Sequence, residues 1–439
     1  MRQLPDQVQE ILRRLEGAGY EAWCVGGAVR DALLGLEPGD WDVTTSAPPE
    51  AVLDLFGPNA LPTGLRHGTV TVGGGRGVEV TTFRRDGDYL DNRHPDHVEF
   101  TGSLTEDLAR RDFTVNAIAV NHRGDLADPS GGREDLQARL LRAVGEPERR
   151  FGEDALRILR GLRFASRLGF SVESDTAAAL HNCAPLLRHI APERIREELT
   201  GILCGGYVRE VLLAYSDVLG VFLPEILPCV GFDQHSVYHC YDVWEHTAHA
   251  VAAAEPLPVL RWAMLLHDLG KPETFTLDGE GRGHFYGHWR SSVPLAEAAL
   301  DRLRMDNQSK KTILTLVERH DAPLTLSEKA VRRALARYGE PTLRLLLKVK
   351  RADNMAQAEQ YRDRQQLIDQ WEDLLELVLR SGDCFSLRQL AVKGGDLTAL
   401  GLRGPAVGEA LGELLEQVMD EKLPNNRGML LEYVKEKLL

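Results

Sequence analysis

The sequence predicts an α+β protein, in which a mixed sheet with helices forms the N-terminal part and helices form the remainder. Two patterns support this division. Short segments rich in valine, threonine and aromatic residues alternate with helical segments over residues 20–122. After about residue 135 these segments stop, and apolar residues such as Leu156, Leu159 and Leu162 recur at helical spacing. A chain of 439 residues is long enough for about two to four domains with buried cores.

The expected strands are short and are bounded by glycine, proline or aspartate. They lie near residues 21–25, 40–44, 69–73, 77–83, 97–101 and 115–121. Ser103-Leu104-Thr105-Glu106 has the form of a capping box, in which the first side chain and the fourth satisfy each other's backbone N–H groups. We therefore expect this segment to begin a helix that carries Arg110 and Arg111.

The composition is that of an ordinary globular protein, with 43% hydrophobic and 27% charged residues. No run of about 18 apolar residues occurs, which excludes a transmembrane helix. The first eight residues predict a polar amphipathic helix and not a secretion signal. The six cysteines lack paired spacing, so we interpret them as apolar residues in a reducing compartment, and we expect a cytoplasmic protein.

Charge is distributed unevenly along the chain. The net charge of −14 argues against binding of RNA over the whole surface. Between Arg139 and Arg167, however, eight arginines stand against four acidic residues. This segment is a candidate for phosphate contacts, although a solvated helix face explains its composition equally well.

Two aspartates follow a glycine pair in the first strand-rich segment. Gly26-Gly27 separates an expected strand from an expected helix, and a turn of this kind presents backbone N–H groups to an anion. Asp40 and Asp42 occupy positions i and i+2 of the next strand, so both carboxylates point to one face. Such a pair can hold two Mg²⁺ ions about 3.5–4 Å apart. Either motif alone is common, but their ordered combination favours nucleotidyl transfer.

Two further segments suggest contacts with a nucleotide. Arg110-Arg111-Asp112 precedes Asn116, and arginines can reach a triphosphate while Asp and Asn suit sugar hydroxyls. Asp154 and Arg157 are three residues apart, which places them on one helix face. An intrahelical salt bridge is the simple interpretation. Alternatively, Asp154 accepts from the amino group of cytosine or adenine while Arg157 donates to the ring nitrogen, which would reject uracil and guanine.

These motifs, in this order, resemble those of class II tRNA nucleotidyltransferases, the family of CCA-adding enzymes and bacterial poly(A) polymerases, over roughly residues 5–210. The resemblance rests on Gly26-Gly27-Ala28-Val29-Arg30-Asp31, Asp40 with Asp42, Arg110 to Ala117, Glu153-Asp154-Ala155-Leu156-Arg157 and Glu193 to Leu199. It implies a nucleotidyltransferase head followed by an all-helical neck, body and tail. The implied bounds are 1–138, 139–205, 206–365 and 366–439.

The resemblance also implies the roles of particular residues. Asp40 and Asp42 would hold Mg²⁺, and Glu79 would be a third catalytic carboxylate. The implied nucleotide-binding residues are Gly26, Gly27, Arg30, Arg111, Asp112, Asn116, Asp154, Arg157, Arg160 and Arg163. The implied partners are tRNA, CTP and ATP, with neither a membrane nor an obligate protein partner.

The product of the reaction is less narrowly defined by the resemblance. A polar, glycine-containing stretch at residues 84–96 occupies the place of a flexible loop that complete CCA enzymes and A-adding enzymes keep. Addition of C, C and A without a template is therefore favoured over addition of C and C alone. An A-adding enzyme and a bacterial poly(A) polymerase are the alternatives within the family.

A separate set of residues suggests a second metal site. His246, His267-Asp268 and Asp353 supply imidazole and carboxylate ligands that suit Mg²⁺, Mn²⁺, Fe or Ni²⁺. The pattern resembles the HD-domain metal phosphohydrolases over about residues 235–360. His288 and His320 match members that hold a second metal, and Lys271 is placed to contact a substrate phosphate. The alternative from another functional class is therefore a hydrolase, which would act at RNA ends as a phosphodiesterase or phosphatase.

Overall fold

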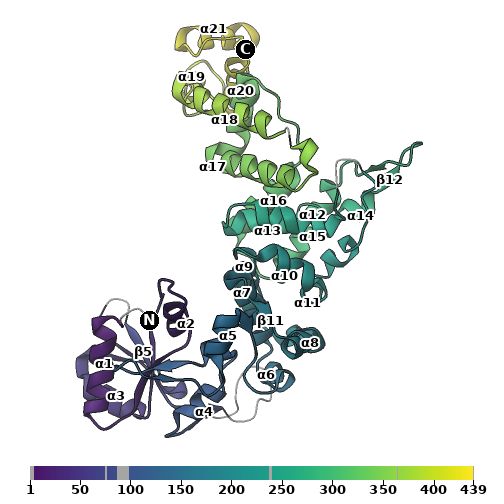
Figure 1. Cartoon of the computed structure of the whole chain (residues 1–439). Coiled ribbons are helices and arrows are strands. Elements are labelled where there is room, and N and C mark those ends of the chain that lie inside the picture. The colour runs from purple at the N-terminus through teal and green to yellow at the C-terminus, as the bar shows by residue number, and fades with distance from the viewer. Residues whose placement is uncertain (1–3, 75–76, 87–97, 237–239, 363, 439) are drawn as a thin grey trace. The chain divides into compact units, whose positions relative to one another are not determined.

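The computed structural model describes residues 4–74, 77–86, 98–236, 240–362 and 364–438 (Figure 1). The chain divides into two units, which are described separately. The first contains Met1–Leu227 with Asp301–Met305, and the second contains Pro228–Leu300 with Asp306–Leu439. The finer division into head, neck, body and tail stays a prediction. The expected loop at 84–96 falls mostly outside the described residues.

A seven-stranded sheet forms the centre of the head, in the order β3-β4-β5-β2-β1-β8-β9. The strands are β1 (Ala22–Val25), β2 (Asp42–Thr45), β3 (Ala60–Gly64), β4 (Thr69–Val72), β5 (Val78–Thr82), β8 (Ala119–Val120) and β9 (Leu126–Ala127). β2 and β5 run parallel, whereas the other neighbouring pairs are antiparallel, so the predicted mixed sheet is confirmed.

The strand prediction was wrong at several places in the head. The segment expected near 115–121 contains a 3₁₀ turn, η3 (Thr114–Asn116), and only then the two-residue strand β8. β3 was not expected, because three of its five residues are exposed and carry no alternating apolar pattern. A short ladder of β6 (Arg84–Asp86) and β7 (Val98–Phe100) lies outside the main sheet.

Five helices belong to the head: α1 (Asp6–Gly17), α2 (Gly27–Leu33), α3 (Pro49–Phe56), α4 (Leu104–Ala109) and α5 (Gly132–Ala138). α1 and α3 pack against the sheet and against each other. α1 turns Val8, Ile11, Leu12 and Leu15 towards the sheet, at the spacing that places residues on one helix face. α2 begins directly after Gly26, whose φ of 81° is a conformation that favours glycine.

The helix that was expected to carry Arg110 and Arg111 differs in two respects. α4 ends at Ala109, so the two arginines follow the helix and are not part of it. Ser103 stands at the N-cap position, but its side chain makes no capping hydrogen bond. Glu106 does not reach back to the N-cap, because its carboxylate contacts Arg85. The predicted capping box is therefore wrong, although the helix begins where it was expected.

The helices after the head pack around an aromatic cluster. They are α6 (Pro147–Glu153), α7 (Leu156–Leu168), α8 (Ser174–Cys183), α9 (Pro192–Leu203), α10 (Val208–Ala214) and α11 (Ser216–Gly220). Phe113, from the head segment before η3, is fully buried against Phe151 and Phe164 at ring-centroid distances of 6.4 and 5.8 Å. A Cβ on Gly161 would lie 2.9 Å from the Phe113 ring, so this close approach requires glycine.

In its described residues the second unit is helical apart from a two-strand ladder, and the first unit has another two-strand ladder after the head. The helices are α12 (Val243–Ala253), α13 (Pro258–Leu266), α14 (Lys271–Thr274), α15 (Trp289–Arg302, whose last two residues belong to the first unit), α16 (Asn307–Arg319), α17 (Glu328–Met355), α18 (Arg364–Ser381), α19 (Gly394–Ala399), α20 (Pro405–Met419) and α21 (Arg427–Lys437). The ladders are β12 (Thr276–Leu277) with β13 (Gly283–His284), and β10 (Leu140–Leu141) with β11 (Ser171–Val172). Strands of two residues are too short to predict from alternation.

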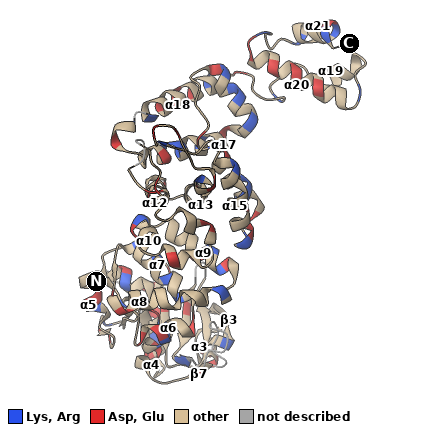
Figure 2. Ribbon diagram, turned by 90° about the vertical axis from the view of Figure 1, so that its right-hand side faces the viewer, with Lys and Arg blue, Asp and Glu red and all other residues tan. Residues whose placement is uncertain are grey.

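α17 is bent, and ion pairs fasten it to α18. The bend lies at Gly339, where φ is 71°, two residues before Pro341. Figure 2 shows acidic and basic residues interleaved on α17 and α18. Arg344 lies 2.7 Å from Glu376, and Arg351 lies 2.8 Å from Asp369. Within the described ranges, no helix combines the length and the apolar character needed to cross a membrane.

A buried carboxylate, Asp107, joins α4 to the sheet. It is 0% exposed and accepts from the Thr44 hydroxyl at 3.1 Å and from Arg110 Nε at 3.0 Å. Arg111 Nη2 lies 3.4 Å from its other oxygen. Burial opposes ionisation, but the positive charges of Arg110 and Arg111 hold the pKa of Asp107 below its ordinary value. This network fixes the two arginines beside β2, the strand that begins with Asp42.

We expect Asp107→Asn to lower the free energy of unfolding by about 2–3 kcal/mol, because it weakens charge-assisted hydrogen bonds to two arginines. The pKa of Asp107 is lowered in the folded state, so its ionised form stabilises the fold above pH about 4. The stability difference between wild type and Asp107→Asn is therefore largest there and becomes smaller as the pH falls further. Urea denaturation at several pH values measures it. Glu106→Gln, one residue away in a more exposed ion pair, is the control and should cost clearly less. Equal losses for the two variants would contradict the role of Asp107.

Candidate functional site

Two carboxylates lie side by side at one end of β2 and β5, and a third, Asp40, lies close enough to act on Asp42 electrostatically. Asp42 is the first residue of β2, and the parallel register places it directly beside Glu79 of β5. Asp40 lies just before the strand and not within it, so the predicted strand start at residue 40 is wrong by two residues. Burial raises the pKa of Asp42 to about 6. The negative charges of Glu79 and Asp40 add to this rise, and the positive charge of Arg111 opposes it. Mutual repulsion of this kind is what a divalent cation would relieve, so the three side chains fit a metal site.

The glycine turn approaches this cluster closely. A Cβ at Gly26 would lie 3.4 Å from Arg111 Nη1 and 3.7 Å from Asp42 Oδ2. A Cβ at Gly27 would lie 3.4 Å from Arg30 Nη2. The glycine pair thus leaves room between Arg111, Asp42 and the start of α2, where a phosphate group would meet a guanidinium and backbone N–H groups.

Next to Arg111 lies an open cavity of about 250 Å³ with a strongly cationic wall. Its lining residues come from the head, α7 and α9, and they are Arg110, Arg111, Asp112, Asp154, Arg157, Arg160 and Arg194. Five of these seven were predicted as nucleotide-binding residues. The fold therefore brings together the arginine pair of the head and the Asp154–Arg157 segment.

Asp112 is the electrostatic link between head and α7. Its Oδ2 accepts from Arg160 Nε at 2.9 Å and from Arg160 Nη2 at 2.7 Å. Its Oδ1 accepts from the backbone N–H of Phe113 at 2.8 Å and from Asn116 Nδ2 at 3.1 Å. Burial would raise its pKa, but Arg160 and these donors lower the pKa of Asp112 to about 2. Asp112 is therefore held as a carboxylate at the edge of the cavity.

Arg30, Asn116 and Arg163 lie apart from the cavity lining. Arg30 is buried and donates to Asn116 Oδ1 at 2.7 Å and to Asp31 Oδ1 at 2.8 Å. Asn116 in turn supports Asp112, so these residues form a chain of contacts from α2 to the cavity. Arg163 Nε lies 3.0 Å from Glu198 and, among the described residues, is not part of the cavity wall.

Asp154 and Arg157 differ from the expected arrangement on one helix face. Asp154 lies in the break between α6 and α7, with an extended backbone, and its side chain accepts from the N–H of Leu156. Arg157 pairs with Glu153 at 2.8 Å, so its ion pair is not with Asp154. It also donates to the carbonyl oxygen of Arg110 at 3.1 Å. Both side chains nevertheless line the same cavity.

Three residues with contacts in or beside this region were not identified from the sequence. Arg194, in α9, lines the cavity and lies 3.9 Å from Asp154. Glu153 holds Arg157, and Asp107 holds Arg110 and Arg111. Arg194 and Glu153 stand inside recognised motifs. The four-residue spacing of Glu153 and Arg157 was a signal for their ion pair, whereas the contact of Arg194 depends on how α9 packs.

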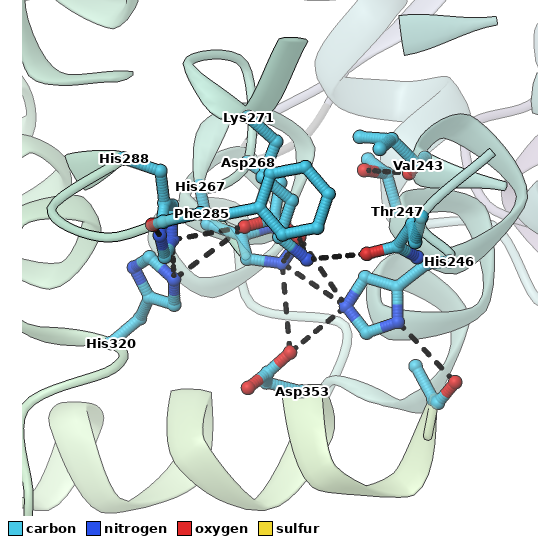
Figure 3. Close-up of polar contacts among 12 residues, drawn as sticks. Val243, His246, Thr247, His267, Asp268, Lys271, Phe285, His288, His320 and Asp353 are labelled. Carbon is cyan, nitrogen blue, oxygen red and sulfur yellow. Dashed lines mark hydrogen bonds and ion pairs between the residues drawn. The ribbon is translucent and has the colours of Figure 1, made fainter. Parts of the chain in front are cut away.

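In the second unit, four histidines and two aspartates form one buried cluster (Figure 3). They come from α12, the end of α13, the segment before α15, the end of α16, and α17. One group is His246, His267 and Asp268, and a second is Asp268, His288 and His320. Asp353 Oδ1 lies 2.9 Å from His246 Nε2 and 3.6 Å from His267 Nε2. All six predicted residues are therefore brought together, with Asp268 shared between the two groups.

The histidines are oriented by backbone carbonyl oxygens. Nδ1 of His267 lies 2.7 Å from the carbonyl oxygen of Met264, and Nδ1 of His320 lies 2.7 Å from that of Val317. Nδ1 atoms of His288 and His246 also face carbonyl oxygens, at 3.0 and 3.3 Å. A carbonyl can only accept, so Nδ1 of each ring carries a proton, and Nε2 faces the centre of the cluster. Metal-binding histidines are held in this way.

The centre of the cluster carries unsatisfied carboxylate oxygens. Both oxygens of Asp268 are buried without a hydrogen bond of acceptable geometry, although His267 Nε2 lies 3.1 Å and Lys271 Nζ 2.7 Å from Oδ2. His288 Nε2 and His320 Nε2 lie 3.0 Å apart, which leaves two imidazole nitrogens facing each other. Burial opposes ionisation, but His267 and Lys271 hold the pKa of Asp268 well below its usual value. Converging nitrogen atoms around a shared carboxylate fit one or two divalent transition metals.

Two cavities open onto this cluster, and His320, Asp321 and Asp353 line both of them. One, of about 310 Å³, also contains Lys271 and the segment from Arg282 to His288. The other, of about 290 Å³, has mixed walls: apolar Leu324, Leu367 and Ile368 with the cations Lys350 and Arg364. The cluster is therefore buried but reachable from solvent.

Comparison with known proteins agrees with this geometry. Three protein-family models match: "Poly A polymerase head domain" at residues 22–142, "Probable RNA and SrmB-binding site of polymerase A" at 169–229, and "tRNA nucleotidyltransferase domain 2 putative" at 292–434. A solved structure of the Bacillus stearothermophilus CCA-adding enzyme in complex with CTP is 30% identical, with a TM-score of 0.73. That alignment covers 98% of this chain and 97% of the other.

Two curated relatives indicate how far the similarity extends. The CCA-adding enzyme of Geobacillus thermodenitrificans is 45% identical over 270 residues, which is 61% of this chain and 64% of the relative. In three further CCA-adding enzymes the matched part is 54%, 63% and 56% of their length, so this chain spans less than two thirds of these curated relatives. The CCA-adding enzyme of Levilactobacillus brevis is 36% identical over 97% of this chain and 96% of its own length. With head motifs, sheet order and nearly full-length similarity in agreement, this chain belongs to the family of CCA-adding enzymes.

Proposed function

We propose that this chain adds C, C and A to the 3′ end of tRNA, using CTP and ATP and no nucleic-acid template. The observation that carries the proposal is the position of the cavity lined by Asp154 and Arg157 beside Arg111, which itself adjoins Asp42. A nucleotide with its base in that cavity would reach the three carboxylates with its phosphates. The similarity to CCA-adding enzymes along the chain supports the same assignment.

Each part of the site has a task in this proposal. Asp40, Asp42 and Glu79 would hold Mg²⁺, which supplies charge neutralisation at the α-phosphate and a lowered pKa of the terminal ribose hydroxyl. Arg111 would contact the triphosphate, and its pairing with Asp107 would keep the guanidinium in place before the substrate arrives. Because these groups are positioned by the fold, little reorganisation would be needed during phosphoryl transfer.

Base selection would depend on Asp154 and Arg157. A carboxylate accepts and a guanidinium donates, so this pair matches the amino group and ring nitrogen of cytosine and adenine. Glu153 holds Arg157 at 2.8 Å, and Arg194 stands 3.9 Å from Asp154. These neighbours would fix the orientation of both readers. Asp112, Asn116, Arg30, Arg160 and Arg163 would support the sugar and phosphate side, and the basic neck would contact the tRNA.

We also propose that the histidine–aspartate cluster is an HD-type metal centre with phosphohydrolase activity. The convergence of four Nε2 atoms on the shared, unsatisfied Asp268 supports it. A bound Mg²⁺, Mn²⁺, Fe or Ni²⁺ would supply a water molecule of lowered pKa. Lys271, which is 5% exposed and lines the cavity, would neutralise a substrate phosphate. A cytoplasmic location is proposed from the six free thiols of the described chain.

The first prediction concerns the product. Three tRNA substrates are compared in the presence of Mg²⁺: one that lacks the CCA end, one that ends in C and one that ends in CC. We expect labelled CTP and ATP to be added to each until CCA is complete, with no further extension. Asp42→Ala should reduce incorporation by about a thousandfold, since metal ligation contributes several kcal/mol to the transition state. Asp54→Ala, at an exposed position of α3, is the matched control. Unlimited addition of A would indicate a poly(A) polymerase. Addition of A only to tRNA that ends in CC would indicate an A-adding enzyme, and no incorporation would indicate a hydrolase.

The second prediction concerns base choice. We expect the double variant Asp154→Glu, Arg157→Lys to accept UTP and GTP, with discrimination reduced by about tenfold or more, because one displaced charge-assisted hydrogen bond is worth about 1.5–3 kcal/mol. Single-nucleotide incorporation with each of the four nucleotides measures the ratio. Arg188→Lys, at an exposed position of the first unit, serves as the control. Unchanged discrimination in the double variant would overturn the assignment of these two readers.

The third prediction concerns the metal content of the second unit. Elemental analysis of the purified protein should detect up to two tightly bound transition-metal ions per chain. We expect His267→Ala to remove most of this metal and His288→Ala to remove about one ion, because the second group shares only Asp268 with the first. His189→Ala, at an exposed position of the first unit, should keep the wild-type content. Retention of all metal in His267→Ala would rule out this cluster as the site.

A further inference from the structure

A hairpin with an unusual aromatic residue stands at the opening of the larger cavity beside the histidine–aspartate cluster. It is formed by β12 and β13 and is followed by Phe285, Tyr286 and Gly287. The Tyr286 side chain is 79% exposed, which is the highest value among the exposed large apolar and aromatic residues of the described chain. Tyr286 also lines the cavity. An aromatic ring kept in solvent at the edge of a polar site requires an explanation.

The exposed ring is supported from one side. His284 and Tyr286 stack with their centroids 5.1 Å apart and their planes 7° from parallel. His284 is itself held, because its Nε2 lies 3.0 Å from Asp278 Oδ2. The other oxygen of Asp278 accepts from the backbone N–H groups of Glu280 and Arg282, both at 2.9 Å, which closes the hairpin turn. Tyr286 therefore rests on a fixed imidazole and leaves its other face open.

The chain on either side of Tyr286 is anchored. Phe285 packs edge-on against Phe232 and tilted against Phe275, at centroid distances of 6.5 and 5.5 Å. Its carbonyl oxygen faces Nδ1 of His288 at 3.0 Å. Two residues, Tyr286 and Gly287, lie between Phe285, which packs inward, and His288, which belongs to the cluster. Tyr286 is therefore exposed on a short segment that is held at both ends.

The same cavity joins this ring to the proposed metal ligands. Besides Tyr286 and His284, its wall contains Lys271, Asp268, His288 and His320. Lys271 Nζ lies 2.7 Å from Asp268 and 2.9 Å from Gln234, so a cation stands beside the cluster. A ligand in this cavity would thus meet cationic and metal-binding groups at one end and a flat aromatic surface at the other. That combination matches a phosphate attached to a planar base.

We propose that Tyr286, supported by His284, is a stacking platform for the base of a nucleotide whose phosphate is held at the histidine–aspartate cluster. The inference rests on the proposed metal centre and names its substrate class as nucleotides or RNA ends. Stacking accepts every base, because each base has a planar face. The platform would therefore set affinity for nucleotides over simple phosphate esters without selecting a sequence. Tyr286 is a binding residue here and takes no part in the hydrolytic step.

The test that does not depend on turnover is photocrosslinking. The full-length protein loaded with Mn²⁺ is irradiated with 5-iodouridine 3′-monophosphate, and the modified peptide is identified by mass spectrometry. We expect crosslinks at Tyr286 or His284, suppressed by excess uridine 3′-monophosphate. The proposed base readers of the head reject uracil, so the head should not compete for this probe. Crosslinks confined to other residues, or none at all, would overturn the platform.

Hydrolysis gives the second readout. We compare kcat/KM for uridine 3′-monophosphate with kcat/KM for glycerol 2-phosphate. In Tyr286→Ala we expect the ratio of the two to fall about tenfold, because stacking is typically worth this much per base. The fall should come from a higher KM for the nucleotide. Tyr286→Phe keeps the ring and should restore the wild-type ratio. Leu277→Ala, 55% exposed on the same hairpin, is the matched control. An equal loss for both substrates would mean a structural role and would contradict the platform.

The outcomes separate this inference from the activity on which it rests. If the protein hydrolyses glycerol 2-phosphate but shows no crosslink and no change in the kcat/KM ratio of Tyr286→Ala, the phosphohydrolase proposal stands and the stacking platform is wrong. A crosslink at Tyr286 without hydrolysis of either ester would keep the platform and remove the phosphohydrolase.

Discussion

Asp112 accepts two hydrogen bonds from Arg160 while the next residue, Phe113, is buried among Phe151 and Phe164. This one dipeptide fastens the sheet that bears the carboxylates to the helices that bear the proposed base readers. A charged pair and an aromatic anchor act at the same point, and the absence of a side chain at Gly161 lets the anchor approach. The cavity exists because these parts form one body, so its catalytic geometry depends on a packing contact as much as on the polar groups.

Both candidate sites are built around a buried carboxylate with arginine, lysine or histidine around it. Asp107 in the head is surrounded by Arg110, Arg111 and Thr44, which satisfy it within the protein. Asp268 in the second unit is surrounded by nitrogen atoms but lacks good hydrogen bonds. Burial raises the cost of a carboxylate that lacks good hydrogen bonds, so the convergence of four imidazoles on Asp268 supports the proposed metal centre.

The two sites also differ in how far their residues lie apart in the sequence. Those of the head come from segments that are short and ordered along the chain, each with a recognisable local motif. The cluster of the second unit joins His246 to Asp353, 107 residues apart, across α12 and α17. Its existence therefore requires that α12, α13, α16 and α17 pack together. Tyr286 is harder still to identify from the sequence, because neither its exposure nor its stacking on His284 can be predicted from the order of residues.

The sequence by itself determined the fold class, the mixed sheet and the segments that contain the functional residues, because period, turn residues and motif order are local properties of the chain. Helix ends and side-chain partners were decided only by the tertiary structure. Ser103 was expected to cap α4 and does not, and Arg157 pairs with Glu153 and not with Asp154. The Glu106 carboxylate that would complete the capping box pairs with Arg85, which is 21 residues away. Asp154 lies in a helix break, and Arg157 pairs with Glu153, four residues before it, so local spacing allowed either partner and the helix boundary decided between them.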